Sequence, residues 1–190
     1  NYMVGGRYKL WGPNLFLGAD VGTGGSDVRK VLGVLGYGRI GQAVAKRALG
    51  FDMDVLAHDP YNREGVEASE YAEWAEFDEL LEKSDFVSLH VLLTDETHHL
   101  IGESELGKMK PTAHLINAAR GEVIDESALV KALQEGWIGG AGLDVFENEP
   151  AMAPGLAECD NAVLLPHIAS ASSDTRGLMA TMAANNAVAH

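Results

Sequence analysis

The fold is decided by the stretch VLGVLGYGRIGQAVA, residues 31–45. It opens with a short apolar run, carries the pattern Gly-x-Gly-x-x-Gly at Gly36, Gly38 and Gly41, and continues into an amphipathic segment. Between a strand and a helix, the first glycine permits a tight turn, the second lets the backbone approach a pyrophosphate, and the third packs the helix against the strand. The free N–H groups at the helix N-terminus add a partial positive charge. The sequence therefore predicts a dinucleotide-binding turn, with a glycine turn that binds no ligand as the alternative.

A second signal follows the next apolar run, Asp54–Ala57. Asp59 lies 18 residues after Gly41, close to the place where an acid accepts hydrogen bonds from the adenosine ribose hydroxyls. Its negative charge would repel a 2′-phosphate, so we expect NAD rather than NADP as the cofactor. Arg63 is the alternative, since it could pair with a 2′-phosphate, but an arginine on the solvated surface is the simpler interpretation.

The rest of the chain alternates between short apolar runs and amphipathic segments. The runs are rich in Val, Leu and Ile and mostly continuous, which is typical of strands buried on both faces of a parallel sheet. The expected strands are Val31–Leu35, Asp54–Ala57, Phe86–His90, Ala113–Asn117, Gly140–Val145 and Ala162–Leu165. The expected helices are Ile40–Leu49, Phe77–Lys83, a helix between an N-cap at Asp125 and Gly136, and Thr175–Ala189. This alternation predicts an α/β fold, a doubly wound parallel sheet of the Rossmann type.

Composition narrows the range of partners. The chain of 190 residues is 46% hydrophobic, too apolar for a disordered chain, and has a formal net charge of −14. Such an acidic chain is a poor candidate for nucleic acid or anionic membrane surfaces, and no apolar run approaches the ~18 residues of a membrane span. We therefore expect no nucleic-acid partner and no membrane partner. The one cysteine, Cys159, excludes an intrachain disulfide, so we expect a reducing, intracellular location, either the cytoplasm or an organelle such as the peroxisome.

Three reactive side chains follow predicted strands at the carboxyl edge of the sheet, where open parallel sheets bind ligands. Arg120, Glu149 and His167 come after the fourth, fifth and sixth predicted strands. Reduction of a ketone by hydride needs a proton donor, and imidazolium can serve near neutral pH when a carboxylate stabilises and orients it. A guanidinium fits the carboxylate of a substrate. These three residues are therefore the predicted catalytic set.

Each of the three also has a plainer interpretation. His167 could be a hydrogen-bonded structural histidine, Arg120 could pair with the acidic surface, and Glu149 could be a turn residue. Their joint placement at one edge favours the catalytic interpretation.

His98 and His99 resemble a metal-binding pair. Adjacent histidines in a strand or a helix point apart, and no suitably spaced acid or cysteine completes a site. The sequence therefore predicts no metal.

Five segments resemble the D-isomer-specific 2-hydroxyacid dehydrogenases, in that family's order and spacing over most of the chain. They are Val34–Gly41, Leu89–Ile101, Leu115–Gly121, Gly142–Pro150 and Leu165–Ser170. The resemblance implies a Rossmann NAD-binding domain, with the second, substrate-binding domain largely missing from these residues. Within the family, the chain is most similar to the plant-type, NADH-dependent hydroxypyruvate reductases (glycerate dehydrogenases), on the segments Trp11–Gly18, Pro150–Ala157, His167–Ser172 and Thr175–Thr181.

The resemblance implies a role for each matching residue. Arg120 would bind the carboxylate and carbonyl of the substrate, His167 would be the acid–base, and Glu149 its partner. The cofactor would be NAD, held by residues at the family's positions: the glycines Gly36, Gly38 and Gly41, Arg39 and Ile40 at the pyrophosphate, Asp59 at the ribose, Val91, Leu92 and Thr97 at the adenosine, and Ala118 and Asp144 at the nicotinamide. The family usually has proline where this chain has Leu92, which loosens that loop but removes no reactive group.

The implied activity is NADH-dependent reduction of a 2-keto acid to a D-2-hydroxy acid, with hydroxypyruvate (giving D-glycerate) or glyoxylate as the substrate. Two alternatives stay open: another family member such as a phosphoglycerate dehydrogenase, and a non-enzymatic NAD(H)-sensing protein like the corepressors. The expected divisions are 1–30 as a hinge from the substrate domain, 31–170 as the dinucleotide-binding domain, and 171–190 as a helix returning to the substrate domain. A homodimer is expected for the complete protein.

Overall fold

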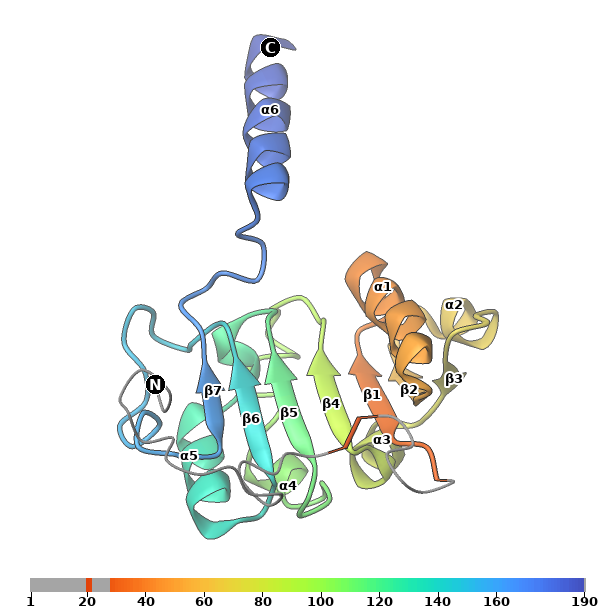
Figure 1. Ribbon diagram of the computed structural model, residues 1–190, viewed down its shortest axis with the longest axis vertical. Coiled ribbons are helices and arrows are strands. Elements are labelled where there is room, and N and C mark those ends of the chain that lie inside the picture. Colours follow the sequence, from red (N-terminus) through yellow and green to blue (C-terminus); the bar gives the residue numbers. More distant parts are fainter. Residues whose placement is uncertain (1–19, 22–27, 190) are drawn as a thin grey trace, which may run out of the picture.

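A parallel sheet of seven strands forms the centre of the computed structural model, which describes residues 20–21 and 28–189 (Figure 1). The strand order is β3-β2-β1-β4-β5-β6-β7. The strands are β1 (Val31–Leu35), β2 (Asp54–His58), β3 (Glu73–Trp74), β4 (Phe86–Leu89), β5 (His114–Asn117), β6 (Gly140–Leu143) and β7 (Ala162–Leu164). The helices are α1 (Arg39–Ala48), α2 (Arg63–Glu67), α3 (Phe77–Lys83), α4 (Glu103–Leu106), α5 (Glu126–Glu135) and α6 (Ser173–Ala189), with 3₁₀ turns at Leu49–Phe51 and Gly121–Val123. The predicted doubly wound α/β fold is confirmed.

Most of the predicted elements are present. The six predicted strands all occur, with ends shifted by no more than two residues, and α3 has the predicted bounds. Helix α5 begins where the Asp125 carboxylate accepts the N–H of Ala128 at 3.0 Å and ends at Gly136, whose φ is 71°. The prediction missed β3, α2 and α4, because segments of 2, 5 and 4 residues show too little periodicity to stand out.

Two apolar cores cover the two faces of the sheet. On one face, α1 and α2 pack on β1 and β2 through residues such as Val34, Ala45 and Val66. On the other face, α3, α4 and α5 pack through a larger core that includes Leu35 and Leu81. Strand β1 contributes to both cores, which explains why its sequence is continuously apolar.

The middle of the sheet is the point where the chain reverses its direction of winding. From β1 the chain continues to β2 on one side, and from β4 it continues to β5 on the other. Such a switch point opens a crevice beyond the carboxyl ends of the two strands. Gly36, directly after β1, has a φ of +90°, and a Cβ there would lie 2.7 Å from the carbonyl carbon of His90. The turns after β1 and β4 therefore touch, and only glycine fits between them.

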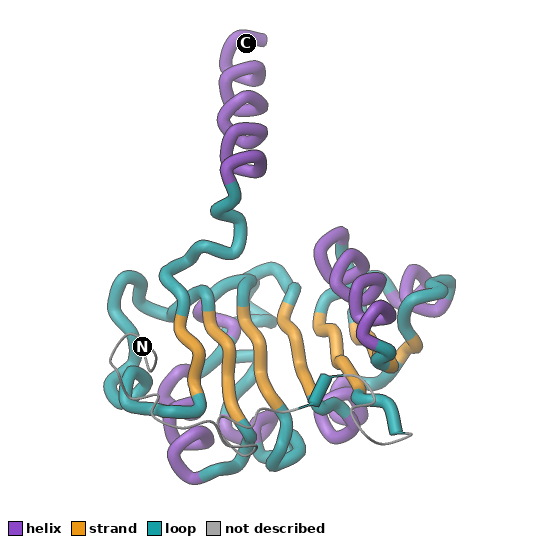
Figure 2. The backbone as a smooth tube through the Cα atoms, viewed as in Figure 1, coloured by secondary structure: helices purple, strands orange, loops and turns teal. Residues whose placement is uncertain are grey.

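Helix α6 extends away from the sheet at the end of a long loop (Figures 1 and 2), and the side chains described along it are exposed. It begins at Ser173, two residues before the predicted start. Residues 1–19 and 22–27, which contain most of the predicted hinge and the segment Trp11–Gly18, lie outside the described residues. The predicted domain divisions stay predictions. Among the described residues, no helix is both long and apolar enough to cross a membrane.

Candidate active site

The glycine turn after β1 has the shape that a pyrophosphate needs. A Cβ on Gly41 would collide with the carbonyl oxygen of Gly36, so α1 starts in close contact with the turn. A Cβ on Gly38 would have nothing within 4 Å. Gly38 is the N-cap of α1, and no side chain caps the helix there. The turn therefore presents open space and free N–H groups, which fit a phosphate group.

Asp59 ties the end of β2 to the glycine turn. Its Oδ2 atom accepts the N–H of Tyr37 at 2.8 Å, and its Oδ1 atom accepts the N–H of Tyr61 at 3.1 Å. The structure thus brings Asp59 to the turn, where its remaining lone pairs can accept from ribose hydroxyls. Arg63 is engaged elsewhere, in an ion pair of 2.7 Å with Glu67. That arrangement favours the interpretation of Arg63 as a surface residue.

The other predicted cofactor residues also lie along the carboxyl edge. Arg39 and Ile40 begin α1 and line a cavity of about 450 Å³ beside that helix. The loop after β4 carries Val91, Leu92 and Thr97, and the Thr97 hydroxyl donates to the Leu92 carbonyl oxygen at 2.6 Å. Leu92 is 82% exposed, so the absence of the family's proline leaves no buried gap. Ala118 is exposed just after β5.

Asp144 has a structural function that the sequence did not indicate. The residue is buried, and its carboxylate accepts the N–H groups of Ile168 and Ala169, each at 2.7 Å. These bonds hold the chain directly after His167, whose φ of 54° is uncommon for a residue other than glycine. Asp144 therefore fixes the backbone of His167, while its predicted contact with nicotinamide stays a prediction.

Arg120, Glu149 and His167 line one cavity of about 410 Å³. The Nδ1 atom of His167 lies 2.9 Å from Oε2 of Glu149. The Glu149 carboxylate also accepts the N–H of Phe146 at 3.1 Å. The hydrogen bonds from His167 and from Phe146 hold the pKa of Glu149 below its usual value. An ionised carboxylate can only accept, so Nδ1 donates to Glu149 and Nε2 is left to act on a substrate.

Arg120 is held through its backbone. The Nδ2 atom of buried Asn117 donates to the Arg120 carbonyl oxygen at 2.8 Å, and its Oδ1 atom accepts the N–H of Ala119 at 3.0 Å. A Cβ on Gly121 would collide with the backbone of Phe146. The turn after β5 therefore presses against the loop after β6, which brings Arg120 to the side of the sheet edge that carries Glu149.

Glu126 is a second supporting acid that sequence reasoning missed. It is buried at the start of α5, where its carboxylate accepts the N–H of Glu147 at 2.6 Å and the N–H of Ala153 at 2.9 Å. Both partners lie on the loop that carries Glu149. The available signal was an acid in the first turn of an apolar helix, but its partners lie 21 and 27 residues away and do not show in the local pattern.

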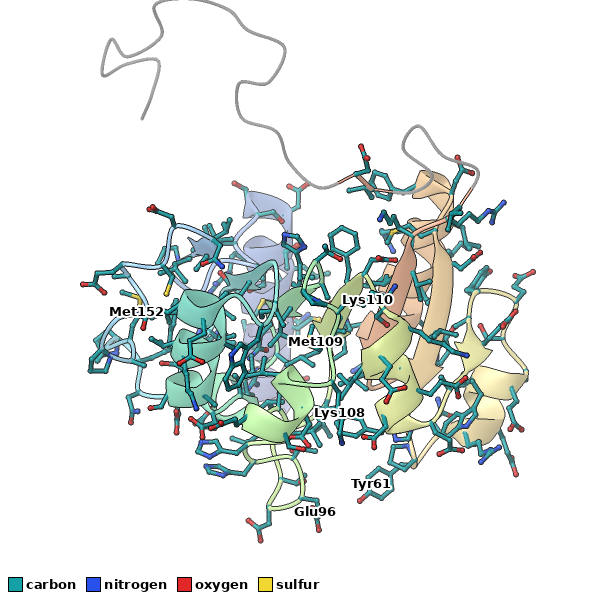
Figure 3. All side chains as sticks on the ribbon, turned by 90° about the horizontal axis from the view of Figure 1, so that it is seen from below. Tyr61, Glu96, Lys108, Met109, Lys110 and Met152 are labelled. Atoms are coloured by element: carbon teal, nitrogen blue, oxygen red, sulfur yellow. The ribbon has the colours of Figure 1, made fainter. Side chains whose placement is uncertain are left out.

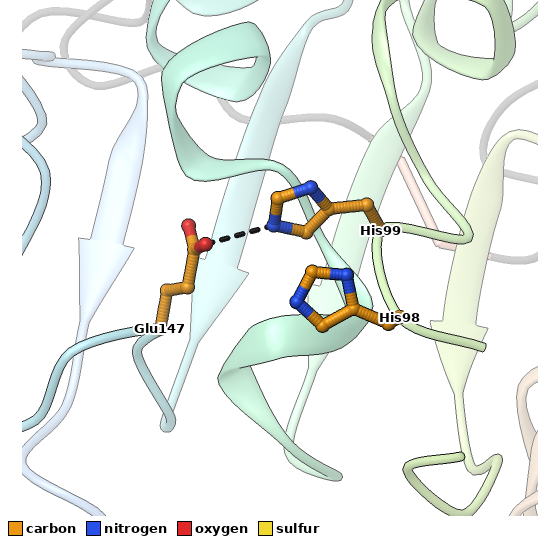
Figure 4. A group of neighbouring side chains, drawn as sticks. All are labelled: His98, His99 and Glu147. Carbon is orange, nitrogen blue, oxygen red and sulfur yellow. Dashed lines mark hydrogen bonds and ion pairs between the residues drawn. The ribbon is translucent and has the colours of Figure 1, made fainter. Parts of the chain in front are cut away.

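The expectation that His98 and His99 point apart is wrong. Their rings stack with centroids 4.0 Å apart and an angle of 26° between the planes (Figure 4). The two residues lie in a turn rather than in a strand or helix, and His99 has a φ of 51°. An acid does complete the group, because the Nε2 atom of His99 lies 2.8 Å from Oε1 of Glu147.

The parallel sheet, the glycine turn and Asp59 together define a Rossmann-type dinucleotide-binding domain. Residues 20–169 match the family described as D-isomer specific 2-hydroxyacid dehydrogenase, NAD binding domain, and the chain belongs to this family. NAD is therefore the cofactor of the domain, as predicted.

Similar proteins agree with this assignment. The chain is 53% identical over 183 residues to a glyoxylate reductase of Pyrococcus horikoshii (96% of this chain, 53% of the relative) and 51% identical over 190 residues to one of Korarchaeum cryptofilum (99% and 55%). A glyoxylate reductase structure from Paecilomyes thermophila matches with a TM-score of 0.82 at 40% identity (97% of this chain, 53% of that one). A D-lactate dehydrogenase from Aquifex aeolicus, complexed with NAD and lactic acid, matches with a TM-score of 0.77 at 38% identity (84% and 53%). The chain thus spans about half the length of the curated relatives it matches.

The family prediction is confirmed. The finer assignment to the plant-type hydroxypyruvate reductases stays a prediction, because these similar proteins are glyoxylate reductases and a D-lactate dehydrogenase.

Proposed function

We propose that the chain provides the NAD-binding part of an NADH-dependent reductase of small 2-keto acids, with glyoxylate as the first candidate substrate and hydroxypyruvate as the second. The observation that carries the proposal is the shared cavity of Arg120, Glu149 and His167. The names of the similar proteins favour glyoxylate, and the resemblance of residues 150–157, 167–172 and 175–181 to hydroxypyruvate reductases favours hydroxypyruvate.

Each of the three residues has a distinct role in this proposal. The bound cofactor would supply the hydride. His167 gives a proton from Nε2 to the carbonyl oxygen at C2 of the substrate, so that the alkoxide does not accumulate. Glu149 accepts from Nδ1, which fixes the orientation of the ring. Arg120 pairs with the carboxylate of the keto acid, which selects 2-keto acids over simple ketones.

The test is oxidation of NADH by the purified full-length protein with glyoxylate, hydroxypyruvate and 3-phosphohydroxypyruvate as substrates. The proposal expects kcat/KM to be highest for one of the first two. A higher value for the phosphorylated acid would identify a phosphoglycerate-dehydrogenase-like enzyme instead. Binding of NADH without turnover of any of the three would favour the NAD(H)-sensing alternative.

A further inference from the structure

We propose that His98, His99 and Glu147 form a binding site for a divalent transition-metal ion, and that Zn²⁺ is the ion that fits its donors best. Each residue offers one donor atom, and the three donor atoms lie within 4.8 Å of one another (Figure 4). Among residues 20–21 and 28–189, this is the one group of three or more His, Cys, Asp or Glu side chains with that geometry. The site shares no residue with the predicted catalytic set, but Glu147 also lines the cavity that holds Arg120, Glu149 and His167.

The two sides of the group come from different loops, and hydrogen bonds tie both loops to the segment 122–126. On one side, the His99 N–H donates to the carbonyl oxygen of Glu122 at 2.8 Å, and the neighbouring Ile101 bridges to Ile124. On the other side, the Glu147 N–H donates to buried Glu126. The side chains therefore meet across 48 residues of sequence because their backbones are held in place. Such preorganisation lowers the entropy cost of gathering ligands around an ion.

The backbone of His99 supports the same conclusion. Its φ of 51° lies in the left-handed region, which is uncommon for histidine. That conformation places the His99 ring beside the ring of His98, whereas an extended backbone would send the two side chains to opposite sides. The strained turn thus converts two adjacent histidines into neighbouring donors.

The donor set selects the class of ion. Two imidazoles and one carboxylate suit Zn²⁺ and its neighbours in the first transition row, whereas Mg²⁺ and Ca²⁺ prefer oxygen donors alone. Tetrahedral bonds of 2.0–2.2 Å would place donor atoms roughly 3.4 Å apart. The Nε2 atom of His99 and the Oε1 atom of Glu147 are closer than this, at 2.8 Å. The three donor atoms as a group lie within 4.8 Å of one another, a limit longer than roughly 3.4 Å. Small rotations of these side chains would equalise the separations, and water would complete the coordination.

The surroundings leave the ion access to the site. His98 and His99 are exposed and Glu147 is half-buried, so an ion can enter without opening the core. The chain carries a formal net charge of −14, which favours the approach of a cation. A bound ion would join the loop after β4 to the loop after β6, the second of which also carries Glu149.

The experiment is calorimetric titration of the metal-free protein with ZnCl₂, at a pH where imidazole is neutral, followed by Co²⁺ absorption as a report on nitrogen coordination. The expected result is one ion per chain and a Tm that rises with Zn²⁺ concentration. His98→Ala, His99→Ala and Glu147→Gln should each weaken binding by about tenfold or more, since even residues that only support metal ligands cost 10–100-fold. Circular dichroism of the metal-free variants checks that they fold.

Two matched controls locate the ion. Glu96→Gln removes a carboxylate from the tip of the same loop, where the side chain points into solvent (Figure 3). His167→Ala removes a second exposed histidine that pairs with an acid. Both variants should keep the affinity for Zn²⁺. Undetectable binding by the parent protein, or binding that His167→Ala abolishes and His98→Ala leaves intact, would overturn the proposal. So would equal affinity in the Glu147→Gln and parent proteins.

Discussion

At the β1–β3 end of the sheet the site is made of main chain, and at the β5–β7 end it is made of side chains. The first end offers a glycine turn, the start of α1 and the single carboxylate of Asp59. The second end gathers Arg120, Glu149 and His167 in one cavity, from turns that follow three different strands. The first arrangement is local in sequence, whereas the second depends on contacts between distant segments.

The supporting acids differ in burial between the two ends. Asp59 is half-buried and accepts the backbone N–H groups of Tyr37 and Tyr61. At the other end, Asp144 and Glu126 are buried, and each accepts two backbone N–H groups. The catalytic end is therefore built on a second layer of buried acids, and damage to that layer should affect turnover more than cofactor binding.

The largest effect is expected from His167→Ala. Loss of a positioned general acid lowers kcat by about 10²–10⁴-fold. Binding of NADH should change little, because the glycine turn follows β1 and Asp59 follows β2, whereas His167 follows β7. The measurements are kcat for reduction of glyoxylate and the NADH dissociation constant by fluorescence titration. If kcat fell by less than about tenfold, another group would be the proton donor. The contrast between a cofactor-binding end and a catalytic end of the sheet would then lose its basis.

The next largest effect is expected from Gly38→Ala. A methyl group on Gly38 meets no protein atom within 4 Å, so the free energy of unfolding should be unchanged. The same methyl group projects into the space that a phosphate would enter, so the affinity for NADH should fall by about tenfold, or ~1.4 kcal/mol. Gly50→Ala is the matched control, because Gly50 also has open space but lies away from the turn. Equal affinity in the two variants would show that the turn does not bind the pyrophosphate.

A pair of isosteric substitutions compares the two ends directly. Asp59→Asn should raise KM for NADH and relax the discrimination against NADPH several-fold, because it removes the charge that repels a 2′-phosphate. Asp144→Asn should leave that discrimination unchanged and lower kcat, because it weakens the bonds that hold the backbone after His167. The check is kcat and KM with both cofactors. If Asp144→Asn changed the preference between NADH and NADPH, the proposed separation of cofactor selection at one end of the sheet from catalysis at the other would be wrong.

The contrast between the two ends also explains which features of the fold and the site could be predicted from the sequence. The glycine turn, β1 and the caps of α5 follow from residues close to one another, so periodicity and spacing predicted them. The roles of Asn117, Glu126 and Asp144 did not follow, because a buried polar residue gives no local sign of its partner. His98 and His99 were misjudged for a related reason: the rule for adjacent side chains assumes a regular backbone, and His99 adopts a left-handed one.

The smallest effect is expected from the pair of Glu149 and His167 on stability. The pKa of Glu149 lies below its ordinary value of 4.5, first because His167 donates to it and then because the N–H of Phe146 does. A lowered pKa means that the pair stabilises the fold above pH 4.5, and that this contribution is lost as the pH falls through the lowered value. Both side chains are more than one-third exposed, so solvent screening keeps the contribution small.

The measurement is the free energy of unfolding of the parent protein and of Glu149→Gln at pH 7 and at pH 3. The parent should be the more stable at pH 7, and the difference should shrink at pH 3, because the stabilisation is lost as the pH falls through the lowered pKa of Glu149. In a His167→Ala background the pH-dependent part should be smaller, since His167 is the larger cause of the lowered pKa. A difference that stayed constant from pH 7 to pH 3 would mean that Glu149→Gln acts through packing rather than through charge. Charge on the Glu149 side chain would then add nothing to stability, and the contrast between the main-chain end and the side-chain end of the sheet would be weaker.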